Sequence, residues 1–125
     1  MGSRRANVLV VEDEILISNL IAEFLNDSGF DVHAVPDAEG ALKYLESGTA
    51  VDAVFTDINL LGEMDGSTLA QRVRERCPEL PIVYCSGRFS PSAVQPLVSR
   101  SIFVRKPYDP ADICTLLTRL TATQH

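Results

Sequence analysis

The chain has 125 residues, of which 46% are hydrophobic and 22% charged, and its formal net charge is −6. This size fits one globular domain, and the composition excludes a disordered chain. The acidic balance argues against a nucleic-acid-binding surface, which needs a basic patch, but it is compatible with binding a cation.

The cysteines and the absence of long apolar segments indicate the cellular setting. Three cysteines without close spacing fit neither a disulfide framework nor a zinc site. We therefore expect core or semi-buried thiols in a reducing compartment at Cys77, Cys85 and Cys114. No apolar run approaches the ~20 residues that span a bilayer, and the N-terminus lacks a hydrophobic signal segment. We therefore expect a cytoplasmic protein without membrane contact. Its predicted parts are an N-terminal extension or cloning remnant at 1–6, one domain at 7–122 and a tail at 123–125.

The first half of the chain predicts two strands alternating with two helices. A run of mostly β-branched apolar residues predicts a buried strand at 7–11. Helical spacing of apolar residues then predicts a helix from 15 to about 28, with one stripe formed by Ile17, Leu20, Ile21, Phe24 and Leu25. Partial alternation over 30–35 indicates a half-exposed edge strand, in which His33 is a solvated residue. Pro36 and Asp37 open a second helix that ends before Gly48.

The second half predicts three more strands and three more helices. A nearly continuous apolar run at 51–56 is typical of a central parallel strand. After a loop at 59–66 come a helix that ends before Cys77, a strand at 80–85, and a weak helix after Ser90 that contains Pro96. A short strand at 102–104 precedes a final helix, capped by Asp109, whose apolar face is Ile113, Leu116, Leu117 and Leu120. Five strands alternating with five helices predict an α/β fold with a parallel sheet covered on both faces.

Polar side chains stand at the carboxyl ends of four of these strands. They are Glu12 and Asp13 after the first strand, Asp57 at the third, Ser86 after the fourth and Lys106 after the fifth. Each one alone has a structural explanation, such as a cap, a turn or a solvated lysine. In a parallel sheet, however, all of them lie on the edge where ligands bind. Their joint placement therefore predicts one functional site.

The residue types at this edge favour phosphoryl chemistry. Three close carboxylates raise one another's pKa unless a cation neutralises them, and Mg²⁺ prefers oxygen ligands. A carboxylate oxygen can attack phosphorus and form an aspartyl phosphate. Such a transfer needs positioning and charge neutralisation, which Mg²⁺ and the Lys106 ammonium can supply, while the Ser86 hydroxyl can hydrogen-bond a phosphoryl oxygen.

Over nearly its whole length the sequence resembles the receiver domains of two-component response regulators, in particular stand-alone regulators of the chemotaxis type. The resemblance rests on five segments: 8–14 (VLVVEDE), 56–60 (TDINL), 64–66 (MDG), 84–87 (YCSG) and 106–107 (KP). It implies a flavodoxin-like (βα)5 three-layer sandwich with a parallel five-stranded sheet of order 2-1-3-4-5. It also implies a Mg²⁺ ion at the sheet edge.

The resemblance assigns a role to each residue at the strand ends. Asp57 is expected to accept a phosphoryl group from a phosphohistidine on a sensor histidine kinase or a histidine phosphotransfer protein. The expected Mg²⁺ ligands are Asp13, Asp57, Glu12 (directly or through water) and the backbone carbonyl of Asn59.

The resemblance also implies a switch. Ser86 is expected to contact the phosphoryl group, and Lys106 to pair with that group or, at rest, with Asp57. Phe103 matches the aromatic residue that turns inward on activation, although an ordinary core aromatic is an equal alternative at this position. The bond before Pro107 is expected to be cis, because X–Pro is the one peptide bond where cis is accessible at low cost.

The sequence departs from the family pattern in two places. The loop after Asp57 has Leu61 where proline is common, and it has one residue more before Met64. The segment 88–100 carries two prolines, which predicts an irregular fourth helix and an unusual choice of partner. Arg88, two residues after Ser86, is a candidate for controlling water access and so the rate of autodephosphorylation.

The leading hypothesis is a phosphorylation-activated switch, not an enzyme acting on other substrates. It would signal by protein contact or phosphorelay to an unidentified output protein, and a phosphorylation-dependent dimer stays open. Because the sequence ends one helix after Lys106, we expect that it contains no DNA-binding or enzymatic output domain. It is then either a stand-alone receiver or a domain excised from a longer chain. A dehalogenase-like phosphatase is disfavoured, because that class has a second aspartate where this chain has Asn59. A receiver fold that takes no phosphate is the third alternative.

Overall fold

Five parallel strands form a single sheet within the residues that this computed structural model describes, which are 5–60, 64–87 and 99–122. The strands are β1 (Asn7–Val11), β2 (Asp31–Val35), β3 (Ala53–Asp57), β4 (Ile82–Ser86) and β5 (Ser101–Arg105). Their order in the sheet is β2-β1-β3-β4-β5, and each neighbouring pair is parallel. The predicted sheet is therefore confirmed.

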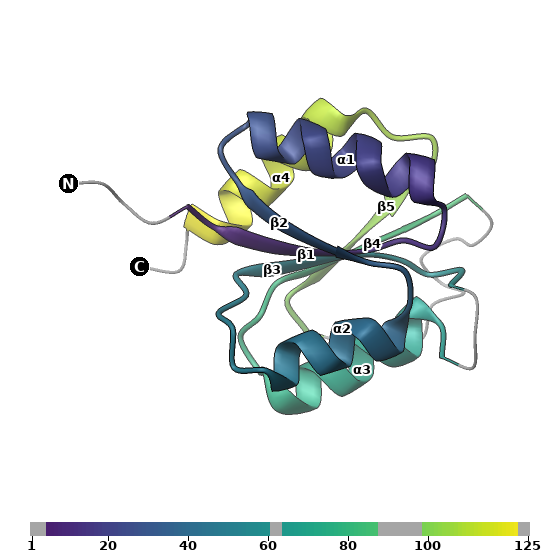
Figure 1. Cartoon of the computed structure of the whole chain (residues 1–125), viewed down its shortest axis with the longest axis vertical. Coiled ribbons are helices and arrows are strands. Elements are labelled where there is room, and N and C mark those ends of the chain that lie inside the picture. The colour runs from purple at the N-terminus through teal and green to yellow at the C-terminus, as the bar shows by residue number, and fades with distance from the viewer. Residues whose placement is uncertain (1–4, 61–63, 88–98, 123–125) are drawn as a thin grey trace.

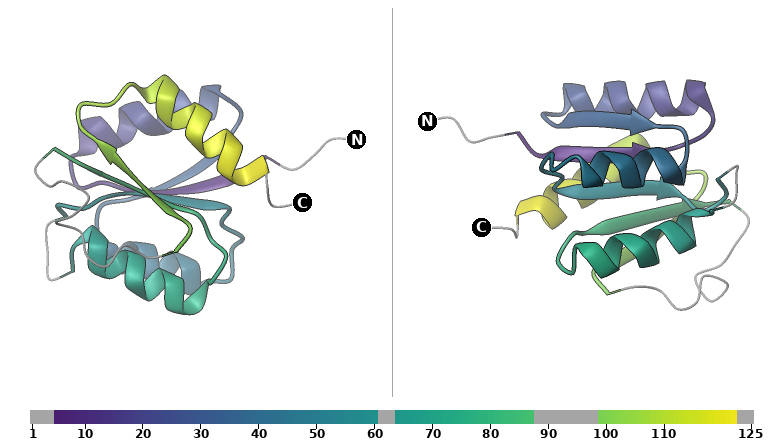
Figure 2. Two further views of the ribbon diagram at one scale, coloured as in Figure 1. Left: turned by 180° about the vertical axis from the view of Figure 1, so that it is seen from behind. Right: turned by 60° about the horizontal axis from the view of Figure 1, so that its bottom comes forward.

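Helices cover both faces of the sheet, which gives three layers (Figure 1). On one face lie α1 (Ile15–Asp27) and α4 (Pro110–Ala122), and on the other lie α2 (Ala38–Glu46) and α3 (Gly66–Arg76). The two further views in Figure 2 show the same layering. The helix expected after Ser90 falls at 88–98, outside the described residues, so α4 is the helix that was expected last.

The alternation of strand side chains produces two cores, one on each face. Leu9, Val11 and Val54 point to the core beneath α2 and α3, whereas Val10 and Phe55 point to the core beneath α1 and α4. All five residues of β3 and of β4 are buried, as expected of strands covered on both faces. The two central strands are thereby fixed in position, and their last residues are Asp57 and Ser86.

The predicted bounds of β1 are confirmed, and most other strand and helix boundaries differ from the predicted ones by one or two residues. Both β3 and β4 begin two residues later than predicted and end one residue later, so Asp57 and Ser86 are paired strand residues and not the start of a loop. In β2, Ala34 is exposed although the alternation predicted an inward position, and His33 is exposed as predicted. The His33 ring stacks on Tyr44 of α2, with 3.8 Å between ring centroids.

The apolar stripe of α1 is wider than the face that the sheet covers. Ile21 and Leu25 are buried, but Leu20 is 62% exposed and Phe24 is 37% exposed. Part of the predicted stripe therefore faces outward, and it borders a groove of about 450 Å³ that Leu20, Lys106 and Tyr108 help to line.

The two ends of the described chain lie together at the edge of the sheet where the strands begin (Figures 1 and 2). The Arg5 guanidinium donates hydrogen bonds to the carbonyl oxygens of Asn26 at 2.8 Å and Phe30 at 2.6 Å, which fastens the chain just before β1. Among the described residues, no helix combines the length and the apolar character needed to cross a bilayer.

Candidate functional site

The residues predicted from the strand ends lie at one edge of the sheet. Glu12 and Asp13 directly follow β1, Asp57 ends β3, Ser86 ends β4, and Lys106 directly follows β5. Because β1, β3, β4 and β5 are consecutive neighbours in a parallel sheet, their carboxyl ends are adjacent. The sheet topology alone therefore brings together side chains that are up to 94 positions apart in the sequence.

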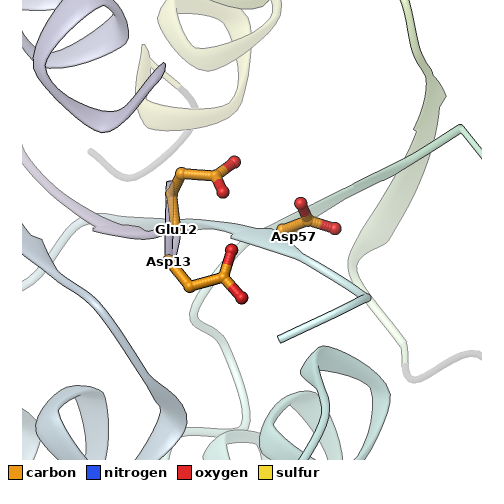
Figure 3. A group of neighbouring side chains, drawn as sticks. All are labelled: Glu12, Asp13 and Asp57. Carbon is orange, nitrogen blue, oxygen red and sulfur yellow. The ribbon is translucent and has the colours of Figure 1, made fainter. Parts of the chain in front are cut away.

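Three carboxylates form the centre of this edge. Glu12, Asp13 and Asp57 each offer an oxygen atom, and these three atoms all lie within 4.8 Å of one another. Figure 3 shows the Glu12 and Asp13 side chains extending from the end of β1 toward the side of Asp57, which stands at the end of β3. Such a group of like charges is stable only with a neighbouring cation or with one carboxyl protonated.

Asp57 is held on both of its oxygens. Its side chain is nearly buried, at 7% exposure. The Asn59 backbone N–H donates to Oδ1 at 2.9 Å, and the Lys106 Nζ donates to Oδ2 at 2.7 Å. The carboxylate is thus fixed in orientation, while each oxygen keeps a further lone pair for a ligand or a reaction.

Lys106 is the cation that lies against the carboxylates. Besides its contact with Asp57, its Nζ lies 3.8 Å from Oε1 of Glu12. Partial burial acts to lower the pKa of Lys106, but the hydrogen bond to Asp57 and the negative charges outweigh it and raise this pKa above its usual range. Lys106 is therefore charged at neutral pH.

Glu12 is the carboxyl group whose proton affinity the site changes most clearly. Burial raises the pKa of Glu12 to about 7, the charge of Asp57 adds to this, and a hydrogen bond from the Glu14 backbone N–H and the charge of Lys106 act against it. Protonation of Glu12 near neutral pH relieves part of the repulsion among the three carboxyls.

Ser86 and Asn59 make a contact that the sequence did not predict. Ser86 is fully buried, and its hydroxyl donates a hydrogen bond of 2.9 Å to Oδ1 of Asn59. The sequence singled out Asn59 only for its backbone carbonyl and for its uncharged side chain. The two residues are 27 positions apart, and no pattern of spacing connects them.

Gly66 is a second residue that sequence reasoning did not assign to the site. It begins α3 directly behind Asp57, and its N–H donates to the Ile58 carbonyl at 2.9 Å. A Cβ atom at this position would lie within 2.9 Å of the Asp57 carbonyl carbon and 2.8 Å of the Ile58 Cα. Only glycine permits this close approach of α3 to the end of β3. In the sequence, the feature that could have indicated it is the glycine that ends the Met-Asp-Gly segment.

Comparison with known proteins identifies the family of this chain. A family model of the response regulator receiver domain matches residues 8–118. The chain belongs to this family. Receiver domains of two-component systems are switches that histidine kinases phosphorylate on an aspartate, so the function predicted at this level is confirmed.

Solved receiver domains have the same fold. A response regulator receiver protein from Sinorhizobium medicae WSM419 is 33% identical, and the match covers 98% of each chain with a TM-score of 0.90. The receiver domain of the hybrid histidine kinase CckA is 25% identical, with a TM-score of 0.79 over 93% of this chain and 99% of that one.

The curated relatives are longer proteins. The nitrogen assimilation regulatory protein NtrX of Azorhizobium caulinodans is 32% identical over 90% of this chain, but the match covers 25% of that protein. The sensor kinase CckA of Brucella abortus is 29% identical over 98% of this chain and is matched over 13% of its own length. The chain thus spans about a quarter or less of these two relatives.

The structure describes some of the remaining residues that the resemblance singled out, but not all of them. Phe103 is half-buried on β5, where it is paired with Tyr84 and packs against the core beneath α2 and α3. The Lys106–Pro107 peptide bond is cis, as predicted. Leu61 and Arg88 lie outside the described residues, so the expectations about the loop after Asp57 and about Arg88 stay predictions.

The donor set of this receiver domain fits the Mg²⁺ ion that the family binds. Carboxylate oxygens are the hard ligands that Mg²⁺ prefers, and three of them converge here from Glu12, Asp13 and Asp57. Burial is the main cause of the raised pKa of Glu12, and the negative charge of Asp57, which also raises it, is one that a cation would balance. The Asn59 carbonyl stays a predicted fourth ligand.

Proposed function

We propose that this chain accepts a phosphoryl group on Asp57 from a histidine kinase or a histidine phosphotransfer protein and acts as a Mg²⁺-dependent switch. The observation that carries the proposal is the Asp57 carboxylate, which is fixed by Asn59 and Lys106 beside Glu12 and Asp13. Signalling then proceeds by protein contact or by phosphorelay, and the chain catalyses only its own phosphorylation and slow autodephosphorylation.

The chemistry of the transfer is a displacement at phosphorus. An oxygen of Asp57 attacks the phosphoryl group, the P–N bond of the donor phosphohistidine breaks, and the imidazole nitrogen leaves with the bonding electron pair. Glu12, Asp13 and Asp57 would hold Mg²⁺ with the Asn59 carbonyl, and bound Mg²⁺ supplies positive charge for the phosphoryl oxygens. Lys106 neutralises charge on the other side of Asp57.

The phosphorylated site then differs from the resting one in charge. A phosphoryl group adds about −1.5 to −2 charge units and new acceptor oxygens beside Lys106 and Ser86. We propose that Ser86 and Phe103 respond to this change and shift a two-state equilibrium.

Phosphorylation of the purified chain tests the proposal. We expect incubation with acetyl phosphate and Mg²⁺ to add the mass of one phosphoryl group, in a bond that hydroxylamine cleaves as it does other acyl phosphates. Chelation of Mg²⁺ is expected to slow the reaction at least about tenfold. No adduct with acetyl phosphate or with any phosphorylated kinase would refute the proposal. Steady release of phosphate from many phosphoesters would instead indicate a phosphatase.

The raised pKa of Glu12 predicts that Mg²⁺ binding depends on pH. At pH values below its pKa of about 7, Glu12 carries a proton that competes with the cation. At pH values above this pKa, the carboxylate is free to bind the cation. The affinity for Mg²⁺ is therefore expected to rise about tenfold between about pH 6 and about pH 8. Calorimetric titration at the two pH values measures it, and Glu12→Gln is expected to remove most of the difference. Equal affinities at both pH values would contradict the assignment.

The exposed apolar side of α1 supports a protein as the phosphoryl donor. Leu20 borders the groove that Lys106 also lines, so this surface is continuous with the site. Exposed apolar patches of this kind mark protein contacts. We expect Leu20→Glu to slow transfer from a phosphorylated kinase by about tenfold or more while transfer from acetyl phosphate is unchanged. Thr118→Glu, on the exposed side of α4, is the control. Equal slowing with both donors would mean that Leu20 acts on the site itself.

A further inference from the structure

Asn59 connects the two residues that the proposed switch depends on. Its backbone N–H donates to Oδ1 of Asp57 at 2.9 Å, and its side-chain Oδ1 accepts the Ser86 hydroxyl, also at 2.9 Å. One residue therefore fixes the carboxylate through its main chain and the hydroxyl through its side chain.

Ser86 has a fixed backbone at the end of β4. Ser86 is fully buried, is paired with Arg105 of β5, and has a carbonyl that accepts the Lys106 N–H at 3.0 Å. The strand thus holds the Ser86 backbone in place, and a change in what the hydroxyl contacts must come from rotation of the side chain or from movement of the whole strand end.

A serine hydroxyl has one proton to donate. In this structure the proton is directed to the amide oxygen of Asn59, whereas the proposed function requires it to be donated to a phosphoryl oxygen on Asp57. The two hydrogen bonds are mutually exclusive. Formation of the phosphoryl contact must therefore break the Asn59 contact.

We propose that the Asn59 side chain is a latch that holds the Ser86 hydroxyl in the resting state and so weakens its engagement with the phosphoryl group. This inference rests on the proposed function of Asp57 and Ser86. Asn59 acts as a positioning residue, because its side chain acts through Ser86. The amide is suited to this role, since it accepts a hydrogen bond without adding a fourth negative charge to Glu12, Asp13 and Asp57.

Breaking one neutral hydrogen bond changes an equilibrium only modestly. Removing the acceptor with Asn59→Ala is expected to raise the affinity for a phosphoryl analogue about fivefold, which corresponds to about 1 kcal/mol. The analogue is beryllofluoride, which binds a carboxylate in the shape of a phosphoryl group. Calorimetric titration with beryllofluoride in saturating Mg²⁺ measures the affinity.

A double-mutant cycle separates the latch from a general effect of the substitution. In a Ser86→Ala background no hydroxyl is left to release, so Asn59→Ala is expected to change the affinity less than about 1.5-fold. In a Ser86→Thr background the hydroxyl is kept, and the gain of about fivefold is expected to return. Thermal unfolding of each variant shows whether it is folded.

The outcomes distinguish the latch from the function on which it rests. If Asn59→Ala changed the affinity for beryllofluoride equally in the Ser86 and the Ser86→Ala backgrounds, or changed it in neither, the latch would be overturned. Binding of the analogue would still uphold Asp57 as the acceptor. If the unaltered chain bound no beryllofluoride and accepted no phosphoryl group from acetyl phosphate, the proposed function would be wrong and the latch would fall with it.

Discussion

Replacing Asp57 by Asn is expected to abolish phosphorylation of the chain. An amide is not a nucleophile toward phosphorus, and Asp57 is the carboxylate that the Asn59 N–H and the Lys106 Nζ orient. We expect the rate of adduct formation with acetyl phosphate and Mg²⁺ to fall more than about 1,000-fold, below detection by intact-mass measurement. The variant should fold, because the amide oxygen can still accept the Asn59 N–H.

Asp37→Asn is the matched control for this substitution. Asp37 follows β2 at the same edge of the sheet and caps α2 by accepting the Gly40 N–H at 2.7 Å. Asparagine caps helices as well as aspartate does, so stability and phosphorylation should both be unchanged. If the Asp57 variant still took up one phosphoryl group at the normal rate, the acceptor would have to be another carboxylate, and Asp13 would be the first to examine.

Gly66→Ala is expected to have the largest effect on stability among single substitutions near the site. The added methyl group would lie 2.8 Å from the Ile58 Cα and 2.9 Å from the Asp57 carbonyl carbon, and both are backbone atoms at the end of a buried strand. Backbone cannot move aside as a flexible side chain can, so α3 or the end of β3 must shift. We expect a loss of about 2–4 kcal/mol in the free energy of unfolding, measured by urea denaturation.

The same shift should displace Asp57 from its two hydrogen-bond donors. We therefore expect the folded fraction of the Gly66 variant to accept phosphoryl groups more slowly as well. Gly87→Ala is the control, because the nearest atom to its added methyl group is the Lys106 Cβ, at an ordinary contact distance of 3.5 Å. Equal stability of the two variants would show that the α3 start is not packed against Asp57 as described.

The fold and the set of site residues could be predicted because both depend on simple sequence patterns. The buried strands are apolar runs, and in a parallel sheet their carboxyl ends meet whatever the details of the loops. For this reason the sequence alone predicts that Asp57, Ser86 and Lys106 lie at the same edge of the sheet. The boundaries were less accurate, because Asp57 and Ser86 are polar residues that continue the ladder of their strands.

The contacts within the site could not be predicted from patterns. The hydrogen bond from Ser86 to Asn59 depends on side-chain rotamers at the ends of two strands, and the fit of Gly66 against Asp57 depends on where α3 begins. The exposure of Leu20 was also missed. Periodicity identifies an apolar stripe on a helix but does not tell how much of the stripe a neighbouring layer covers.

The position of the two chain ends determines how the domain can be extended. The segment just before β1, in which Arg5 is bound to Asn26 and Phe30, and the end of α4 lie where the strands begin, whereas Asp57 is the last residue of β3. Five residues of strand span about 16 Å. A purification tag or a fluorescent label joined at either end would therefore leave the carboxylate edge open to a protein partner. For the same reason, a signal from Asp57 to anything joined at these ends would have to cross the full length of the sheet.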